Sequence, residues 1–289
     1  MDKPRILIQL DSDPHASVFD RVVAVDAGVE HLFSYSGVRP DEVQALVHGA
    51  IFTRGPKDLH RTAIFVGGSD VRTGEAILAE VRRTLMPKYG LSVSVMLDSN
   101  GCNTTAAAAV RAASRHMDLA STGALVLGGT GPVGQRVARL LARQGADVAI
   151  GSRQIARAEE VCSAIRQTYP HAKIRAVSTA TAADAPGALE GRTLAIAAGA
   201  AGVVLLPSKV WTAAGLRLVI DLNAVPPLGI EGVDAGDAGV DCSGTLCYGA
   251  IGVGGTKMKI HRAAIAGLFE SNKRTLDAEE IYDLASTIH

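Results

Sequence analysis

The sequence predicts an α/β protein built from two domains. Strand-length apolar runs alternate with amphipathic stretches along residues 1–120, and a glycine-rich turn in mid-chain joins a further apolar run to a further helical stretch. With 289 residues, of which 47% are hydrophobic and 20% charged, the chain can bury two cores. We expect an N-terminal parallel α/β domain, a second α/β domain, and C-terminal helices that return to the first.

The first domain is expected to span residues 1–120. Each of four strand-like runs is followed by a polar turn and an amphipathic stretch. These runs are Arg5–Leu10, Glu30–Tyr35, Thr62–Val66 and Leu91–Leu97. Strands that alternate with helices form parallel sheets, because each helix carries the chain back across the sheet. The segment Arg115–Gly123 marks the predicted boundary.

A glycine-rich turn opens the second domain, expected over residues 121–256. The apolar run 123–128 leads into Gly129-Thr130-Gly131-Pro132-Val133-Gly134, and a helical stretch follows to residue 145. Glycines let the backbone approach a pyrophosphate, whose charge the helix N-terminus stabilises, and Pro132 suits a first helical turn. This context predicts a Rossmann-type NAD(P)-binding domain. Its expected turn contacts are Gly129, Thr130, Gly131, Pro132 and Val133.

The second strand of this domain indicates which cofactor binds. The run 147–151 ends in Ser152-Arg153, where NAD-specific enzymes usually carry an acidic residue. Asp147 begins the strand and is therefore expected at the opposite end of the sheet. Arg153 and, one helical turn on, Arg157 suit the 2′-phosphate of NADP, because guanidinium groups form paired hydrogen bonds with phosphate oxygens. Alternatively, both arginines are solvated surface residues without a ligand, or the cofactor is NAD.

Three further strands are predicted to complete the second sheet, at 175–177, 194–198 and 216–222. The small residues Ala198, Gly199 and Ala200 end one of them and would admit the cofactor closely, although helix–sheet packing explains them equally well. Asp221 and Asn223 end the last strand and are expected beside the nicotinamide.

The C-terminal segment, residues 257–289, is expected to pack on the first domain. Helical stretches are predicted at 257–268 and 278–288, after the glycine-rich segment 249–255. Lys257 lies one residue after this glycine-rich segment and is the candidate catalytic residue. The neighbouring Lys259, His261 and Arg262 are interpreted mainly as a solvated basic face.

Polar loops after three strands of the first domain predict the substrate site, because ligands of open α/β sheets bind at the carboxyl ends of the strands. Asp11 follows the first strand, and the segment 98–105 is the richest in carboxylate, amide and hydroxyl groups. The candidate substrate contacts are Asp11, Asp98, Ser99, Asn100 and Asn103. Alternatively, Asn103 or Thr104 caps the following helix, which would leave Asp98 and Asn100 without a structural task.

Composition excludes several classes of partner. Lys+Arg and Asp+Glu both total 29, so the net charge of zero gives no general attraction to nucleic acid or to an anionic membrane. The apolar runs are strand-sized and the start has no signal-peptide pattern, so a cytoplasmic location is expected. The spacing of Cys102, Cys162, Cys242 and Cys247 suggests neither a metal site nor a disulfide framework.

Several longer strings resemble the bacterial, methylotroph-type methylene-tetrahydromethanopterin and methylene-tetrahydrofolate dehydrogenase family. The most specific are LDSNGCNTTAAAA (97–109), GGTGPVGQR (128–136), DLNAVPPLGI (221–230) and GAIGVGGTKMKIHRA (249–263). Shorter ones include SVFD (17–20), IFTRG (51–55), TAIFVGG (62–68) and LFES (268–271). The resemblance implies a two-domain oxidoreductase of one-carbon metabolism and a homo-oligomer, with a trimer suggested.

The implied reaction oxidises the methylene bridge of a reduced pterin to methenyl and passes a hydride to NADP, with NAD as the alternative. A methylene group between two nitrogens can lose hydride directly, so no general base is needed and positioning carries the catalysis. Lys257 matches a lysine of the family's G-G-x-K-x-K-x-H segment, and we assign it a positioning role. Asp98 or Asp221 would stabilise the cationic product.

Three alternatives stay open. Tetrahydrofolate is the rival one-carbon carrier. A shikimate-dehydrogenase-like or folate-type NADP dehydrogenase would share the two-domain plan. A non-catalytic NADP-binding sensor would bind cofactor without turning over a pterin.

Overall fold

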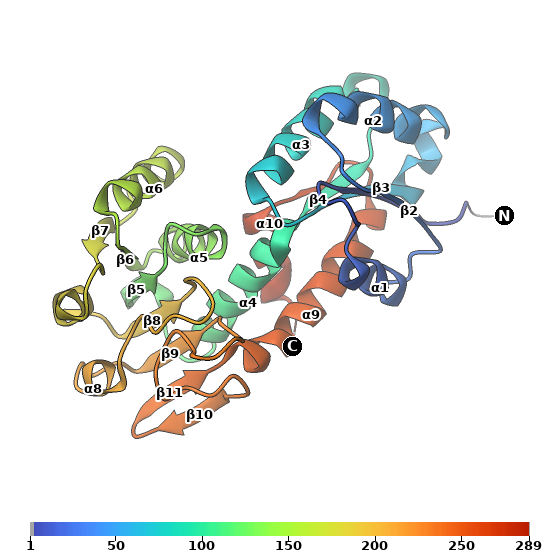
Figure 1. The fold of residues 1–289 in the computed structure, drawn as a ribbon. Coiled ribbons are helices and arrows are strands. Elements are labelled where there is room, and N and C mark those ends of the chain that lie inside the picture. The colour runs from blue at the N-terminus through green and yellow to red at the C-terminus, as the bar shows by residue number, and fades with distance from the viewer. Residues whose placement is uncertain (1–2, 289) are drawn as a thin grey trace. The chain divides into compact units, whose positions relative to one another are not determined.

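The computed structural model describes residues 3–288 and divides into two compact units. Residues 3–104 and 258–288 form the first unit, and Thr105–Lys257 form the second (Figure 1). The expectation about a signal peptide rests partly on Met1 and Asp2, which lie outside the described residues, as does His289. No helix within residues 3–288 is long and apolar enough to cross a membrane.

The first unit contains a parallel sheet with strand order β12-β4-β3-β1-β2. Its strands are β1 (Ile6–Asp11), β2 (His31–Tyr35), β3 (Thr62–Gly67), β4 (Ser94–Leu97) and β12 (Thr275–Leu276). Its helices are α1 (Val18–Asp26), α2 (Val43–Phe52), α3 (Val71–Thr84) and α10 (Ala278–Ser286), and it shares α4 (Cys102–Ser114) and α9 (Ala250–Gly267) with the second unit. The core lies between the sheet and α2 and α3, where Val47, Ile64 and Ile77 are fully buried. All four predicted strands are present.

The second unit contains a sheet with strand order β10-β11-β9-β8-β5-β6-β7. Its strands are β5 (Gly123–Leu127), β6 (Asp147–Ser152), β7 (Ile174–Ser178), β8 (Leu194–Ala197), β9 (Leu218–Asp221), β10 (Ala238–Cys242) and β11 (Thr245–Tyr248). Its helices are α5 (Pro132–Arg143), α6 (Ile155–Thr168), α7 (Ala185–Leu189) and α8 (Ser208–Trp211). The parallel strands from β7 to β11 follow the order 3-2-1-4-5-6 of dinucleotide-binding domains. The predicted Rossmann-type fold is confirmed.

Short 3-10 turns connect several of these elements. They are Pro40–Glu42, Pro56–Arg61, Pro87–Tyr89, Ser99–Gly101, Leu119–Ser121, Ala182–Asp184 and Leu268–Glu270.

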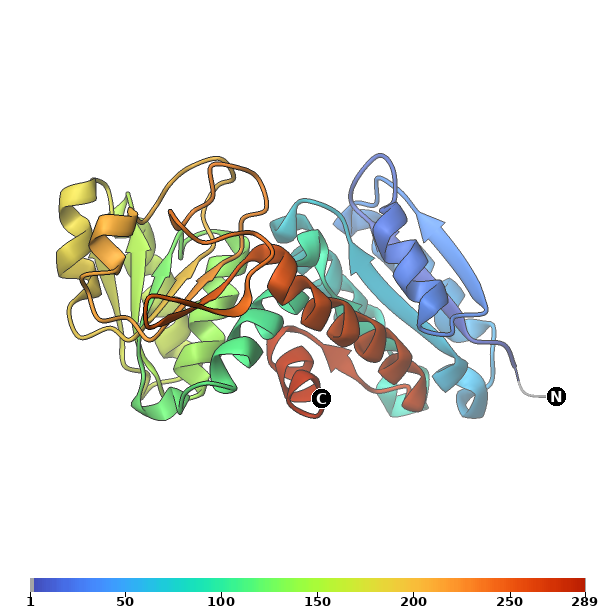
Figure 2. The same cartoon turned by 90° about the horizontal axis from the view of Figure 1, so that it is seen from below.

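The C-terminal segment completes the first unit, as predicted. Strand β12 pairs in parallel with β4, and the hydroxyls of Ser92 and Ser94 donate to the carbonyl oxygens of Asn272 and Ser271 at 2.9 and 2.8 Å. Figure 2 shows the red C-terminal strand and helix beside the elements of this unit. The strand itself was not predicted, because two residues carry no recognisable periodicity.

The predicted start of the helix α9, at residue 257, is wrong. The helix begins at Ala250 and includes most of the glycine-rich segment that was expected to precede it. A Cβ atom at Gly249 or Gly252 would overlap the backbone of residues 234–238. These two glycines therefore permit close packing against a neighbouring loop, and the cost of glycine in a helix does not end the helix here.

Candidate functional site

A pocket of about 490 Å³ opens at the carboxyl ends of the strands of the second unit. Its walls come from the segments that follow β5, β6, β7 and β8, on both sides of the point where strand order reverses between β5 and β8. Ligands of doubly wound sheets bind at this position. The predicted cofactor residues that line it are Thr130, Gly131, Pro132, Ser152, Arg153, Arg157, Ala198, Gly199 and Ala200.

The glycine-rich turn forms the floor of this pocket. Gly131 directly precedes α5, and Pro132 occupies its first turn. The first N–H groups of a helix have no intrahelical partner, so the start of α5 can accept an anion. A Cβ on Gly134 would lie 2.5 Å from the carbonyl oxygen of Gly128 and 2.8 Å from Cα of Gly129. Gly134 therefore holds the helix close to the turn.

Two arginines border the same pocket after β6. Arg153 and Arg157 are both exposed, and neither forms an ion pair with a carboxylate among residues 3–288. Asp147 lies at the opposite end of β6, where its carboxylate pairs with Arg192 at 3.0 Å. Asp147 thus begins the strand, as expected, and the part of the pocket that follows β6 is cationic. The cofactor contacts of Arg153 and Arg157 stay a prediction.

Four other predicted cofactor residues, Gly129, Val133, Asp221 and Asn223, do not line the pocket within the described chain. Asp221 is fully buried, and its carboxylate accepts hydrogen bonds from the backbone N–H groups of Asn223 and Ile230 at 2.9 and 2.6 Å. Burial raises the pKa of Asp221, and these hydrogen bonds act in the opposite direction. Asn223 Nδ2 donates to the carbonyl oxygen of Ala200 at 3.1 Å. Both side chains thus support a wall of the pocket.

The pocket also has walls that the sequence did not reveal. Thr179, Ala180 and Thr181 follow β7, and Val203, Val204 and Leu205 follow the Ala198–Ala200 segment. The rule that loops after parallel strands form the site would have found the first group. The second group is apolar, and Val203 and Val204 are 43% and 42% exposed.

In the first unit, the predicted polar loops meet at the carboxyl edge of the sheet. The Asp13 carboxylate accepts hydrogen bonds from the backbone N–H and hydroxyl of Ser69, which joins the loops after β1 and β3. Ser99 Oγ donates to the carbonyl oxygen of Gly67 at 2.9 Å, and Asn100 N donates to that of Gly68 at 2.7 Å. The loops after β1, β3 and β4 therefore form one polar surface.

Most of the predicted substrate residues are buried within this surface. Asp11, Asp98, Ser99 and Asn103 are each at most 1% exposed, whereas Asn100 is exposed. Asp98 Oδ1 accepts hydrogen bonds from the N–H groups of Asn103 and Thr104 at 2.9 and 3.0 Å. The expectation that Asp98 lacks a structural task is therefore wrong, because its own carboxylate caps the start of α4. A direct substrate contact stays a prediction for all five residues.

A buried histidine adjoins Asp98 and was not recognised from the sequence. His261 is fully buried, with Nδ1 at 4.0 Å from an Asp98 oxygen and Nε2 at 3.9 Å from an Asp20 oxygen. Its ring stacks on Phe65, with 5.7 Å between centroids. Burial raises the pKa of Asp20 to about 6, although His261 opposes this shift. The interpretation of His261 as part of a solvated face is wrong, whereas Lys259 and Arg262 are exposed.

Lys257 lies on α9 and is partly buried. Its catalytic role stays a prediction.

The doubly wound sheet, its glycine turn and the pocket at the switch point define an NAD(P)-binding fold. The profile "Methylene-tetrahydromethanopterin dehydrogenase, N-terminal" matches residues 18–100. The chain is 44% identical over 284 residues to "Bifunctional protein MdtA" of Methylorubrum extorquens, covering 97% of this chain and 98% of that protein. It is 30% identical to the "NAD(P)-dependent methylenetetrahydromethanopterin dehydrogenase" of the same organism, covering 98% of each.

This chain belongs to the methylene-tetrahydromethanopterin dehydrogenase family. Among solved structures, shikimate 5-dehydrogenase from Listeria monocytogenes has a similar fold, with a TM-score of 0.54 and 14% identity over 97% of this chain and 96% of that one. At this identity the similarity concerns the fold alone.

Proposed function

We propose that this protein transfers a hydride from methylene-tetrahydromethanopterin to NADP and releases the methenyl form. The observation that carries the proposal is the cationic pocket at the switch point of a chain from this family. The relative that is 30% identical is named as an NAD(P)-dependent enzyme for this substrate, which supports both halves of the reaction.

The residues of the pocket fit a dinucleotide. Gly131 and the start of α5 would hold the pyrophosphate, and Arg153 with Arg157 would bind the 2′-phosphate of NADP. When bound, the nicotinamide accepts the hydride. NAD lacks the 2′-phosphate and so gains nothing from the two guanidinium groups, which is why we propose NADP as the preferred cofactor.

The pterin would bind at the polar surface of the first unit. Among the predicted contacts, Asn100 has the exposed amide that can reach a ligand, and Asp11, Asp98, Ser99 and Asn103 hold the loops that present it. Lys257 would position the substrate. No side chain has to remove a proton, because the methylene carbon loses its hydrogen as hydride and the adjacent nitrogens share the resulting charge.

We also propose that the protein works as a cytoplasmic homo-oligomer. The proposal of a homo-oligomer is supported by an apolar stripe on α1, where Val18, Val22 and Val25 are 71%, 55% and 61% exposed. Valines spaced by four and three residues share one helix face, and exposed apolar faces of this kind commonly mark protein contacts.

Turnover by the purified full chain tests the proposed reaction. Methylene-tetrahydromethanopterin and methylene-tetrahydrofolate are supplied separately without oxygen, each with NADP and with NAD, and reduced nicotinamide is followed by absorbance. We expect the methanopterin carrier with NADP to give the highest kcat/KM. A higher value with the folate carrier would reassign the substrate. Tight NADP binding without turnover of either carrier would identify a sensor instead.

A further inference from the structure

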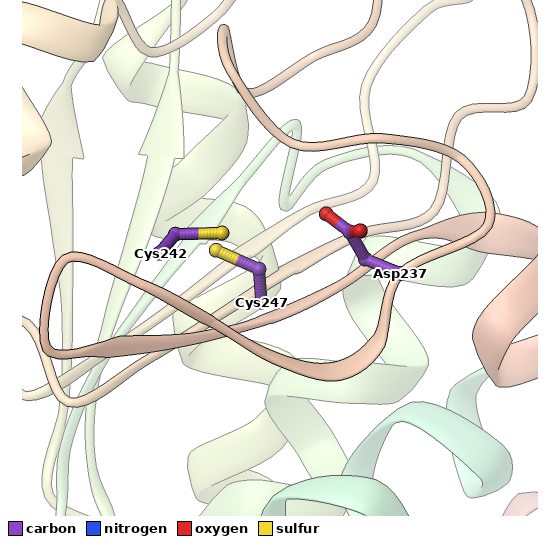
Figure 3. Close-up of side chains that lie close together, drawn as sticks. All are labelled: Asp237, Cys242 and Cys247. Carbon is purple, nitrogen blue, oxygen red and sulfur yellow. The ribbon is translucent and has the colours of Figure 1, made fainter.

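Three potential metal ligands come together in the second unit, outside the lining of the cofactor pocket. Asp237, Cys242 and Cys247 each offer one ligand atom, and the three atoms lie within 4.8 Å of one another. Figure 3 shows the two sulfur atoms turned toward each other and the carboxylate directed to the same side. We propose that these residues form a zinc site of two thiolates and one carboxylate.

The hairpin register places the cysteines on one face. Cys242 pairs with Thr245, and Cys247 pairs with Val240, so the two cysteines are diagonal neighbours across β10 and β11. Residues two apart along a strand point to the same side of the sheet, which gives Val240, Cys242 and Cys247 a common face. This juxtaposition depends on strand pairing, and for that reason the spacing of the cysteines along the chain does not reveal it.

The third ligand is held by the turn before β10. Asp237 Oδ2 accepts a hydrogen bond from the N–H group of Asp234 at 2.9 Å, which fixes the orientation of the carboxylate. A register shift between Ala238 and Val240 then bends the start of the strand. The turn therefore holds a carboxylate oxygen beside the two sulfur atoms.

The diagonal register of the two cysteines favours a metal over a disulfide. Diagonal neighbours in an antiparallel pair have Cβ atoms up to about 7–8 Å apart, whereas a disulfide needs about 3.8 Å. Two sulfurs bound at about 2.3 Å to one tetrahedral zinc ion lie roughly 3.8 Å apart. Small side-chain movements within the 4.8 Å limit would reach that arrangement.

The surroundings suit a soft divalent cation. Cys247 is fully buried and Cys242 is partly buried, so a fourth, open position would face the more accessible side, where water can bind. Binding of one Zn²⁺ to both thiols releases two protons and leaves two thiolates on the metal.

A metal at this position would join the hairpin to the start of α9. The carbonyl oxygen of Asp237 accepts a hydrogen bond from Gly249 N at 2.9 Å, and that of Ala235 accepts one from Ile251 N at 2.8 Å. The same turn therefore carries a ligand and holds the first residues of the helix. The ion's expected role is structural.

Cobalt binding to the reduced, full-length protein tests the proposal, because tetrahedral Co²⁺ thiolate sites absorb visible light and report their own ligands. Co²⁺ is titrated without oxygen into the wild type, Cys242→Ser and Asp237→Asn, and Zn²⁺ is then added. The matched control is Cys162→Ser, a buried cysteine of α6 outside the cluster. Circular dichroism verifies that each variant is folded.

We expect the wild type and Cys162→Ser to bind one Co²⁺ per chain, which Zn²⁺ displaces. The thiolate charge-transfer band should weaken in Cys242→Ser, because only Cys247 remains as a thiolate ligand, and Asp237→Asn should bind Co²⁺ at least tenfold more weakly. A wild type that binds no stoichiometric Co²⁺ would overturn the proposal, as would an unchanged spectrum in Cys242→Ser. Oxidation of Cys242 and Cys247 to a disulfide in preference to metal binding, detected by thiol counting, would also overturn it.

Discussion

Arg153 is the residue on which the proposed cofactor preference depends. Its exposed guanidinium borders the pocket and has no carboxylate partner in the described chain. Hydrogen bonds to a charged group contribute about 1.5–3 kcal/mol, so Arg153→Ala should weaken NADP binding by roughly 10- to 100-fold and leave NAD binding unchanged. Fluorescence titration with both reduced cofactors measures this. Arg175→Ala, which removes an exposed arginine of β7 outside the pocket, is the control. Equal weakening of both cofactors would refute the assignment.

Asp20, whose carboxylate lies 3.9 Å from His261, makes the stability of the folded protein depend on pH. Burial raises its pKa from 3.8 to about 6 in the folded protein, so between these values the folded state binds more protons than the unfolded state. Stability from this group is therefore present at low pH and is lost as pH rises through about 6. Asp20→Asn should flatten that decline and stabilise the protein at pH 7 by up to about 3 kcal/mol.

Urea unfolding from pH 4 to pH 7 measures the effect of Asp20. Asp26→Asn, an exposed carboxylate of the same helix, should keep the wild-type slope. A variant Asp20→Asn with the wild-type slope would show that this carboxyl does not carry the effect.

For individual residues, the sequence predicted where a side chain lies better than it predicted what that side chain does. The placement of Arg153 and Asp147 followed from the strand ends, which local sequence defines. The roles of Asp98 and His261 did not follow, because each depends on contacts between segments far apart in the chain. Asp98 meets His261 only after the C-terminal segment has joined the first unit.

Helix α5 and the turn before it form the element that shapes the cofactor pocket. Gly134→Ala would place a Cβ against the backbone of Gly128 and Gly129, and overpacking of this kind costs about 1–3 kcal/mol. We expect a lower Tm and weaker cofactor binding. Gly187→Ala in α7 has open space around its Cβ and should be neutral or slightly stabilising. Thermal unfolding with and without NADP compares the two, and similar behaviour of both variants would contradict the packing argument.

Strong periodicity explains which elements the sequence could predict. The central parallel strands are continuous apolar runs between turns, and each expected one is present. The two-residue β12 and the hairpin β10–β11 lack this signal: β10 is largely exposed, and its pairing is defined by β11 rather than by its own pattern. The predicted start of α9 was wrong because glycine generally disfavours a helix, whereas here the close packing of Gly249 and Gly252 against a neighbouring loop requires glycine at the start of the helix.

For the whole molecule, the exposed stripe of α1 is expected to bury itself between copies of the chain. A charge in the middle of an apolar contact is costly, so Val22→Asp should shift the assembly toward smaller species while the monomer stays folded. Light scattering coupled to size exclusion measures the mass. Val240→Asp, which alters a 48% exposed valine of β10, is the control. An unchanged mass for Val22→Asp would place the contact elsewhere or show that the chain acts alone.

Deuterium tracing shows whether the methylene carbon passes its hydride directly to the nicotinamide. The full-length protein is given methylene-tetrahydromethanopterin with both methylene hydrogens replaced by deuterium, together with NADP, and the products are analysed by mass spectrometry and NMR. We expect one deuterium at C4 of the reduced nicotinamide, one retained on the methenyl carbon, and none in the solvent. Deuterium released to water, or the absence of turnover despite bound NADP, would contradict this expectation.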